Sequence, residues 1–149
     1  MASGSVTVVD RGWERIRLQC KELAGRGVKV GFRAGGAAAG EVIDYASFNE
    51  FGTSRIPSRP FMRRTADAGR DQVAAFAARQ ARAIVEGHAT AEQALDRLGL
   101  WYVDQIQETI KNAANWAAPL APATTAAKGS SQPLVDTRTM LRSIDYEKD

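Results

Sequence analysis

The side chains with the most evident chemistry are a group of arginines that follows one glutamate: Glu50, Arg55, Arg59, Arg63 and Arg64. Arg59 and Arg63 are one helical turn apart, and a planar guanidinium can hold a carboxylate and backbone carbonyls together. We therefore predict that Arg59 and Glu50 are partners. Three interpretations of the arginine group stay open: a solvated face paired locally with Glu50 and Asp67, a charged contact between subunits, or a DNA-facing surface. The candidates for the DNA-facing surface are Arg63 and Arg64.

No group of residues in the sequence has the composition of an active site. His88 is the only histidine and is expected in a turn between helices. Cys20 is the only cysteine and is expected as a small buried side chain on the apolar side of a helix. Metal sites need clustered ligands, and the glycine-rich run from Gly35 to Gly40 lacks the Lys-Ser/Thr ending of a phosphate-binding loop. We expect no enzymatic activity, no metal, no cofactor and no small-molecule ligand.

Length and composition indicate a single domain over residues 1–149. A chain of 149 residues with 44% hydrophobic residues can bury one core but hardly two. Its formal net charge of +3 makes the surface mildly basic, without the dense Lys/Arg blocks of an autonomous nucleic-acid binder. No apolar run approaches the ~20 residues of a membrane span, and the first residues do not resemble a signal peptide. We expect a soluble protein with no membrane partner.

The first third of the chain predicts a helix and then a strand. Asp10 is placed to cap a helix, whose apolar residues recur at helical spacing: Trp13, Ile16, Cys20 and Leu23. Glycines follow this helix. Val28, Val30 and Phe32 then alternate with other residues, as in a half-buried strand. Further along, the aromatic pair Phe48 and Phe51 is expected in the core.

The middle of the chain predicts a long helical hairpin. Pro60 suits the first turn of a helix, and one apolar face then descends at steps of three and four through Phe61, Thr65, Gly69, Val73, Phe76, Gln80 and Ile84. Thr90 and Gln93 form a capping box that opens a second helix, with Leu95, Leu98, Tyr102, Ile106 and Ile110 on one face. These two helices are expected to pack against each other.

The last part of the chain predicts an arm and a closing strand. Residues 113–133 are rich in Ala, Pro, Ser, Thr and Gly, so we expect an extended arm without a packed element of its own. Asp136 is a good N-cap for the short stretch around Met140, and residues 143–147 alternate like a strand. The predicted fold is α+β, a small mixed or antiparallel sheet packed by the helical hairpin.

Several short motifs follow one another in a fixed order between Val28 and Tyr146. They are Asn49–Thr53, Ile56–Phe61, Trp116, Pro119, Thr124, Lys128-Gly129 and Pro133–Thr137. In this order the chain resembles the neck and tail-completion proteins of tailed bacteriophages, the virion morphogenesis family represented in phages HK97 and Mu. One position departs from the family pattern, because Arg138 stands where a glycine is usual. We therefore expect the backbone there to avoid the left-handed region.

The resemblance implies a structural virion protein, made in the host bacterial cytoplasm, that forms a ring at the head-tail interface or completes the head-proximal end of the tail. It implies a cyclic homo-oligomer of about six subunits, with neighbouring neck and tail proteins as partners and possible non-specific contact with genome DNA. The candidate contact residues are Glu50, Arg55, Arg59, Arg63, Trp116, Leu120 and Lys128. Trp116 either packs on the core or anchors a subunit contact. Two alternatives stay open: a small basic nucleic-acid-binding module, and a transient assembly factor absent from the finished particle.

Overall fold

A computed structural model of the protein describes residues 7, 9–33, 40–135 and 138–149, and these form an α+β fold. The elements in chain order are α1 (Trp13–Leu23), β1 (Val28–Phe32), α2 (Gly40–Phe51), α3 (Phe61–Glu86), α4 (Ala91–Lys111), the 3-10 helix η1 (Ala113–Asn115), α5 (Pro122–Lys128), α6 (Thr139–Arg142) and β2 (Ile144–Lys148). The predicted fold class is confirmed. The expectations for Asp136 and for residues 35–39 lie outside the described residues.

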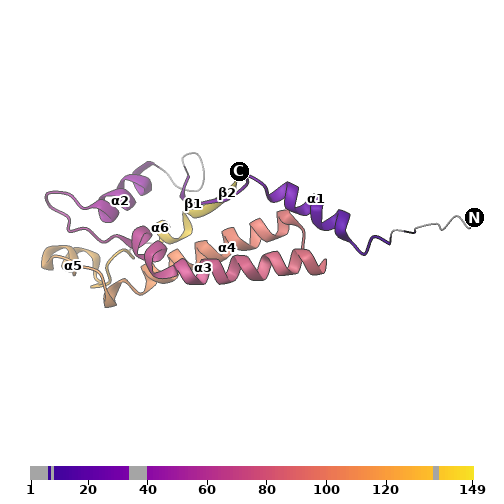
Figure 1. The fold of residues 1–149 in the computed structure, drawn as a ribbon. Coiled ribbons are helices and arrows are strands. Elements are labelled where there is room, and N and C mark those ends of the chain that lie inside the picture. Colours follow the sequence, from indigo (N-terminus) through magenta and orange to yellow (C-terminus); the bar gives the residue numbers. More distant parts are fainter. Residues whose placement is uncertain (1–6, 8, 34–39, 136–137) are drawn as a thin grey trace, which may run out of the picture.

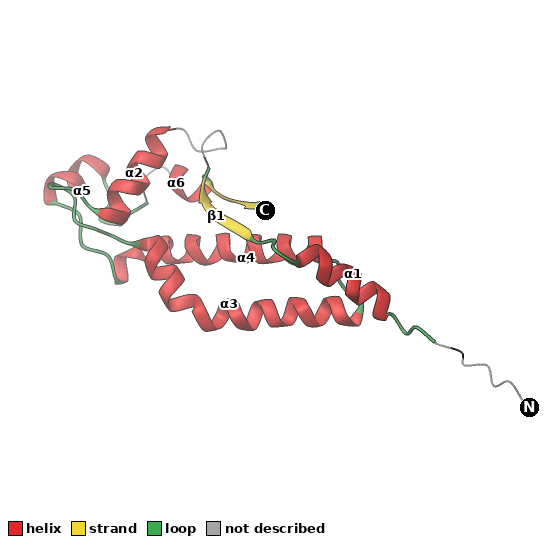
Figure 2. Ribbon diagram, turned by 45° about the horizontal axis from the view of Figure 1, so that its top comes forward, coloured by secondary structure: helices red, strands yellow, loops and turns green. Residues whose placement is uncertain are grey.

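The predicted helical hairpin is confirmed, and α3 and α4 lie side by side along most of the molecule (Figure 2). Every residue of the apolar faces predicted for the two helices is buried or half-buried. The capping box is present: the Thr90 hydroxyl accepts from the Gln93 N–H at 3.2 Å, and the Gln93 side chain accepts from the Thr90 N–H at 3.1 Å. Local sequence signals therefore fix where these helices begin and which face they bury.

A two-stranded antiparallel sheet packs against α4, on the side away from α3 (Figure 1). The register pairs Val28 with Lys148 and Phe32 with Ile144, as expected for a closing C-terminal strand. Gly99 of α4 lies beneath Tyr146 of β2. A Cβ added to Gly99 would lie 2.5 Å from Cγ of that ring, so glycine permits the close approach of helix and strand.

The main hydrophobic core lies at the end of the hairpin where α3 begins and α4 ends. Its fully buried residues include Phe61, Ile106 and Ile110, and α2, α6 and β2 complete it. A smaller cluster around Ile84 closes the opposite end, at the turn between α3 and α4. In the described part of the chain, no helix is long and apolar enough to cross a bilayer.

Helix α1 lies on the hairpin turn with no buried residue of its own, and Leu23 packs half-buried against the Ile84 cluster. The expected cap is present, because Asp10 Oδ1 accepts from the Trp13 N–H at 2.6 Å. Arg15 donates to the Ile84 and Val85 carbonyls at 2.7 and 2.9 Å. The expectation that Cys20 is buried is wrong, and the thiol is exposed. The helix is present as predicted, but that side of α1 is only partly covered: Ile16 and Leu23 are half-buried, and Trp13 is exposed.

The segment 113–133, expected as an arm, leaves the core near η1 and includes the short helix α5. No residue of α5 is buried, and α5 lies at the same end of the molecule as α2 (Figure 1). Pro122 opens α5, and Gly129 ends it in a left-handed conformation with φ 66°. Local turn chemistry therefore forms this helix without the support of a core.

Candidate functional site

The motif segments Asn49–Thr53 and Ile56–Phe61 fold into one tight loop between α2 and α3. Gly52 has a φ of +77°, and a Cβ there would approach the Ser58 backbone nitrogen to 3.0 Å. The Thr53 hydroxyl accepts from the Ile56 N–H at 3.0 Å, and the Thr53 N–H donates to the Ile56 carbonyl at 2.8 Å. Gly52 and Thr53 of the motif thus both determine the backbone conformation of the loop.

Glu50 caps α3 from outside that helix. Its side chain is only 7% exposed. Its carboxylate accepts from the Met62 N–H at 2.8 Å and from the Arg63 N–H at 3.1 Å. These amides belong to the first turn of α3, where helical N–H groups lack an internal acceptor and the helix dipole favours an anion. Since Pro60 gives α3 no side-chain cap, Glu50 of α2 supplies it.

Arg59 joins the loop to the segment that follows η1. It is 4% exposed, and its guanidinium donates to the carbonyls of Ala118 at 2.7 Å and Pro119 at 3.0 Å. The third donor reaches Asn49 Oδ1 at 3.1 Å. Two neighbouring parts of the motif pattern, around Asn49 and Arg59, and a distant part at Pro119 therefore meet at one buried arginine.

The predicted pair of Arg59 and Glu50 is wrong. Arg63 forms the ion pair with Glu50 instead, with Arg63 Nε 3.1 Å from Glu50 Oε1. The reason is geometric: Arg63 lies in the helical turn that the carboxylate caps, whereas Arg59 precedes the helix and faces the 118–119 carbonyls. The backbone carbonyls that we expected around Arg59 are present, but no carboxylate is among its hydrogen-bond partners in the described residues.

The sequence-derived contact candidates separate into buried and accessible residues. Glu50 and Arg59 are buried within one chain, so they hold the fold and offer little surface to a neighbour. Arg55 is exposed, and Leu120 is half-buried. Lys128 donates to the Gln132 carbonyl at 2.8 Å. Whether these residues touch another subunit stays a prediction.

The two DNA-facing candidates are engaged with aromatic rings. The Arg63 guanidinium lies 5.5 Å from the centre of the Phe51 ring. The Arg64 guanidinium lies 5.0 Å from that of Trp116. Trp116 itself packs half-buried on the core, and its Nε1 donates to the Thr109 carbonyl at 2.9 Å. These cation–π contacts orient both arginines, and the contact with DNA stays a prediction.

An aromatic face of α2 is exposed, contrary to the prediction from sequence. We expected Phe48 and Phe51 in the core, but they are 48% and 72% exposed, and Tyr45 is 39% exposed. The buried face of α2 is instead formed by small and polar side chains, Ala46, Asn49 and Glu50. The spacing of three residues between Phe48 and Phe51 was the available signal, because it places both of them on the side opposite Ala46.

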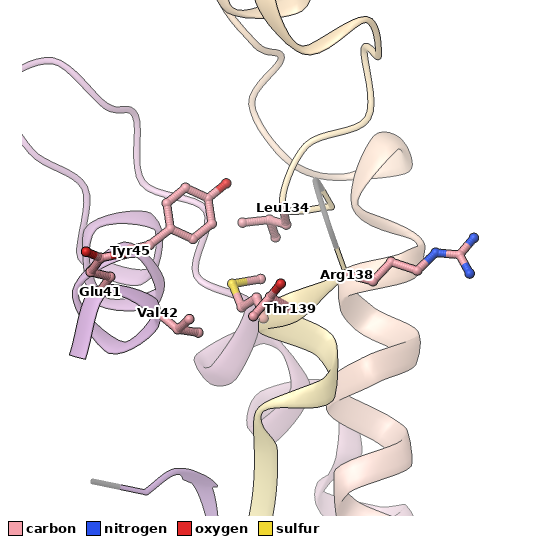
Figure 3. Close-up of a pocket in the computed structure, with 7 residues that line it drawn as sticks. Glu41, Val42, Tyr45, Leu134, Arg138 and Thr139 are labelled. Carbon is pink, nitrogen blue, oxygen red and sulfur yellow. The ribbon is translucent and has the colours of Figure 1, made fainter. Parts of the chain in front are cut away.

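A cavity of about 290 Å³ lies between α2 and the segment around α6. Figure 3 shows Tyr45 pointing toward Leu134, while the Arg138 side chain points away from α2. Leu134 and Arg138 have φ values of 64° and 62°, so both are in the left-handed region. The expectation that Arg138 avoids this region is wrong. Leu134, which is buried, and Arg138, which immediately precedes α6, therefore both adopt a conformation that glycine takes more readily.

A charged cluster ties the C-terminal strand to α4. Lys148 Nζ lies 2.6 Å from Glu92 Oε2 and 2.7 Å from Asp96 Oδ1, and Arg26 reaches Glu92 at 2.6 Å. The hydrogen bond from Lys148, followed by that from Arg26, lowers the pKa of Glu92. The Lys148 bond likewise lowers the pKa of Asp96. Among the described residues, no three His, Cys, Asp or Glu side chains gather as metal ligands.

Comparisons with protein-family models, with curated proteins and with solved structures found no significant match. The buried charges of the site are used to cap a helix and to hold a loop, which is a structural role.

Proposed function

We propose that the chain is a structural virion protein of a tailed bacteriophage, which assembles into a ring at the neck or at the head-proximal end of the tail. The observation that carries the proposal is the meeting of the motif segments at Arg59. The residues that carry the family resemblance, around 49–61 and 116–119, are the ones that this arginine connects. A shared structural centre explains why these motifs occur together in one order.

Two surface features support a role in assembly. The aromatic face of α2 exposes large apolar side chains, and such patches on soluble domains mark contacts with other proteins. The helix α5 has no buried residue, so this part of the segment 113–133 is available to contact a neighbouring subunit. A ring built from repeated heterologous contacts would use both surfaces, as well as Arg55, Leu120 and Lys128.

Cryo-electron microscopy of particle necks tests the proposal. We expect about six copies of this chain around the tail axis, because that axis imposes rotational symmetry on what caps it. A single off-axis copy would contradict the proposal. Mass spectrometry that finds no copy in purified particles would favour the transient assembly factor. A steep loss of DNA affinity with rising salt for free subunits would favour the nucleic-acid-binding module.

Hydrogen exchange tests the part assigned to segment 113–133. We expect faster exchange across residues 124–131 in free subunits than in assembled particles, since contacts with a neighbour would offset the cost of ordering. Deleting residues 121–127 should leave the subunit folded and prevent the joining of heads and tails. Equal exchange in both states, or normal particles from the deletion variant, would remove the segment from the assembly mechanism.

A further inference from the structure

The outer edge of β1 is an open hydrogen-bonding edge. The Asp149 N–H donates to the Gly27 carbonyl at 3.1 Å, so these two residues form a hydrogen-bonded pair. The next pairs in the same register are Val28 with Lys148 and Lys29 with Glu147. Hydrogen-bonded pairs alternate along an antiparallel ladder, so Lys29 and Gly31 bond to β2 while the backbone groups of the alternate residues point away. Those alternate residues are Val28, Val30 and Phe32. In the described part of the chain, no element pairs with this edge.

The outer edge of β2 is partly closed. The N–H of Tyr146 points away from β1 and donates to the side chain of its neighbour, Asp145 Oδ1, at 2.8 Å. The other oxygen of this carboxylate, Asp145 Oδ2, lies 3.4 Å from Arg33 Nη2. Natural sheets limit edge-to-edge association with such side chains. The two edges of the sheet are therefore unequal.

The charges on the solvent face of the sheet differ between the strands. Lys29 and Arg33 are on or next to β1, whereas Asp145 and Glu147 are on β2. Like charges directly opposite each other destabilise a strand pair, and opposite charges stabilise it. A β1–β1 contact between two copies would bring the basic rows together, and a β2–β2 contact would bring the acidic rows together. Only a β1–β2 contact continues the alternation of charge.

We propose that the outer edge of β1 in one copy pairs with the outer edge of β2 in the next copy, which forms a sheet continuous across subunits. The inference rests on the proposed ring, and it names the contact that closes it. Because the two edges differ, the contact is heterologous and can repeat around an axis.

Residue-resolved hydrogen exchange on the wild-type chain tests the pairing, with its own internal control. In rings, the amides of Val28, Val30 and Phe32, and of Ile144 and Lys148 on β2, are expected to exchange about a hundredfold slower than in free subunits. Lys29 and Gly31 should be protected in both states. Rings in which the β1 amides do not change would overturn the inference and leave the proposed function intact. Protection of β1 without β2 would identify another strand as the occupant and overturn it too.

A proline variant tests the same edge through assembly. Val28→Pro removes an N–H that points away from β2, at the first position of an edge strand where proline is tolerated. We expect a folded subunit that assembles at least about tenfold less well by native mass spectrometry. Val28→Ala, which keeps the N–H, should assemble like the wild type. Equal assembly of both variants would refute the pairing, and absence of any ring in wild-type particles would remove both this inference and the proposed function.

Discussion

Replacing Gly99 by alanine is expected to destabilise the protein, although alanine favours a helix. An added Cβ would lie 2.5 Å from Cγ and 2.8 Å from Cε2 of Tyr146, and closer still to Cδ2. Carbon atoms need about 3.5–4.0 Å, so the ring must move by about 1 Å or more. Tyr146 belongs to β2, and its hydroxyl donates to Asp96 at 3.1 Å. The movement therefore strains the strand pair and this hydrogen bond together.

The expected loss is about 2 kcal/mol of the free energy of unfolding. Overpacking a closely packed site costs about 1–3 kcal/mol, and losing the tyrosine hydrogen bond adds about 1 kcal/mol. The higher helix propensity of alanine offsets about 1 kcal/mol. For a chain of this length, the net loss corresponds to a melting temperature lower by about 4–8 °C.

Thermal and urea unfolding of a double-mutant cycle measures this effect. In a Tyr146→Ala background, Gly99→Ala should be neutral or stabilising by up to about 1 kcal/mol, because the clash is gone. Gly69→Ala is the matched control, since a Cβ at this position in α3 would meet nothing within 4 Å. An unchanged or higher melting temperature for Gly99→Ala with Tyr146 present would refute the reasoning. An equal loss in both backgrounds would assign the effect to something other than the ring.

Three further changes test other parts of the structure by unfolding measurements. Arg138→Gly should stabilise by about 0.5–1 kcal/mol, because glycine adopts the left-handed conformation at φ 62° without strain; a loss of stability would contradict this. Arg59→Lys should destabilise by about 2 kcal/mol, since an ammonium cannot reach three separated acceptors at once; a variant that melts like the parent would show that the guanidinium fork is dispensable. Hydrogen bonds from Lys148 lower the pKa of Glu92 and Asp96 from their ordinary values of 4.5 and 3.8. These carboxylates contribute stability above pH 4.5 that is lost as the pH falls through their lowered pKa values. Lys148→Gln should therefore reduce the loss of melting temperature on acidification, and an unchanged pH profile would contradict this assignment.

The sequence by itself determined the elements whose signals are local. The alternation of Val28, Val30 and Phe32 predicted β1, and the spacing of apolar residues predicted both helices of the hairpin. Thr90 and Gln93 fixed the start of α4, because a capping box is complete within four consecutive residues. These predictions succeeded because hydrogen bonds and side-chain periodicity within one element do not depend on which other elements lie nearby.

The tertiary structure decided the features that depend on contacts between elements. Glu50 caps α3 and Arg59 binds the 118–119 carbonyls, because packing brings α2, α3 and the segment after η1 together. The burial of small and polar side chains on α2 leaves Phe48 and Phe51 exposed, which residue types alone do not indicate. Arg138, at the entry into α6, takes a conformation that its own preference opposes. Local preferences are worth about 1 kcal/mol each, and the packing of a core outweighs them.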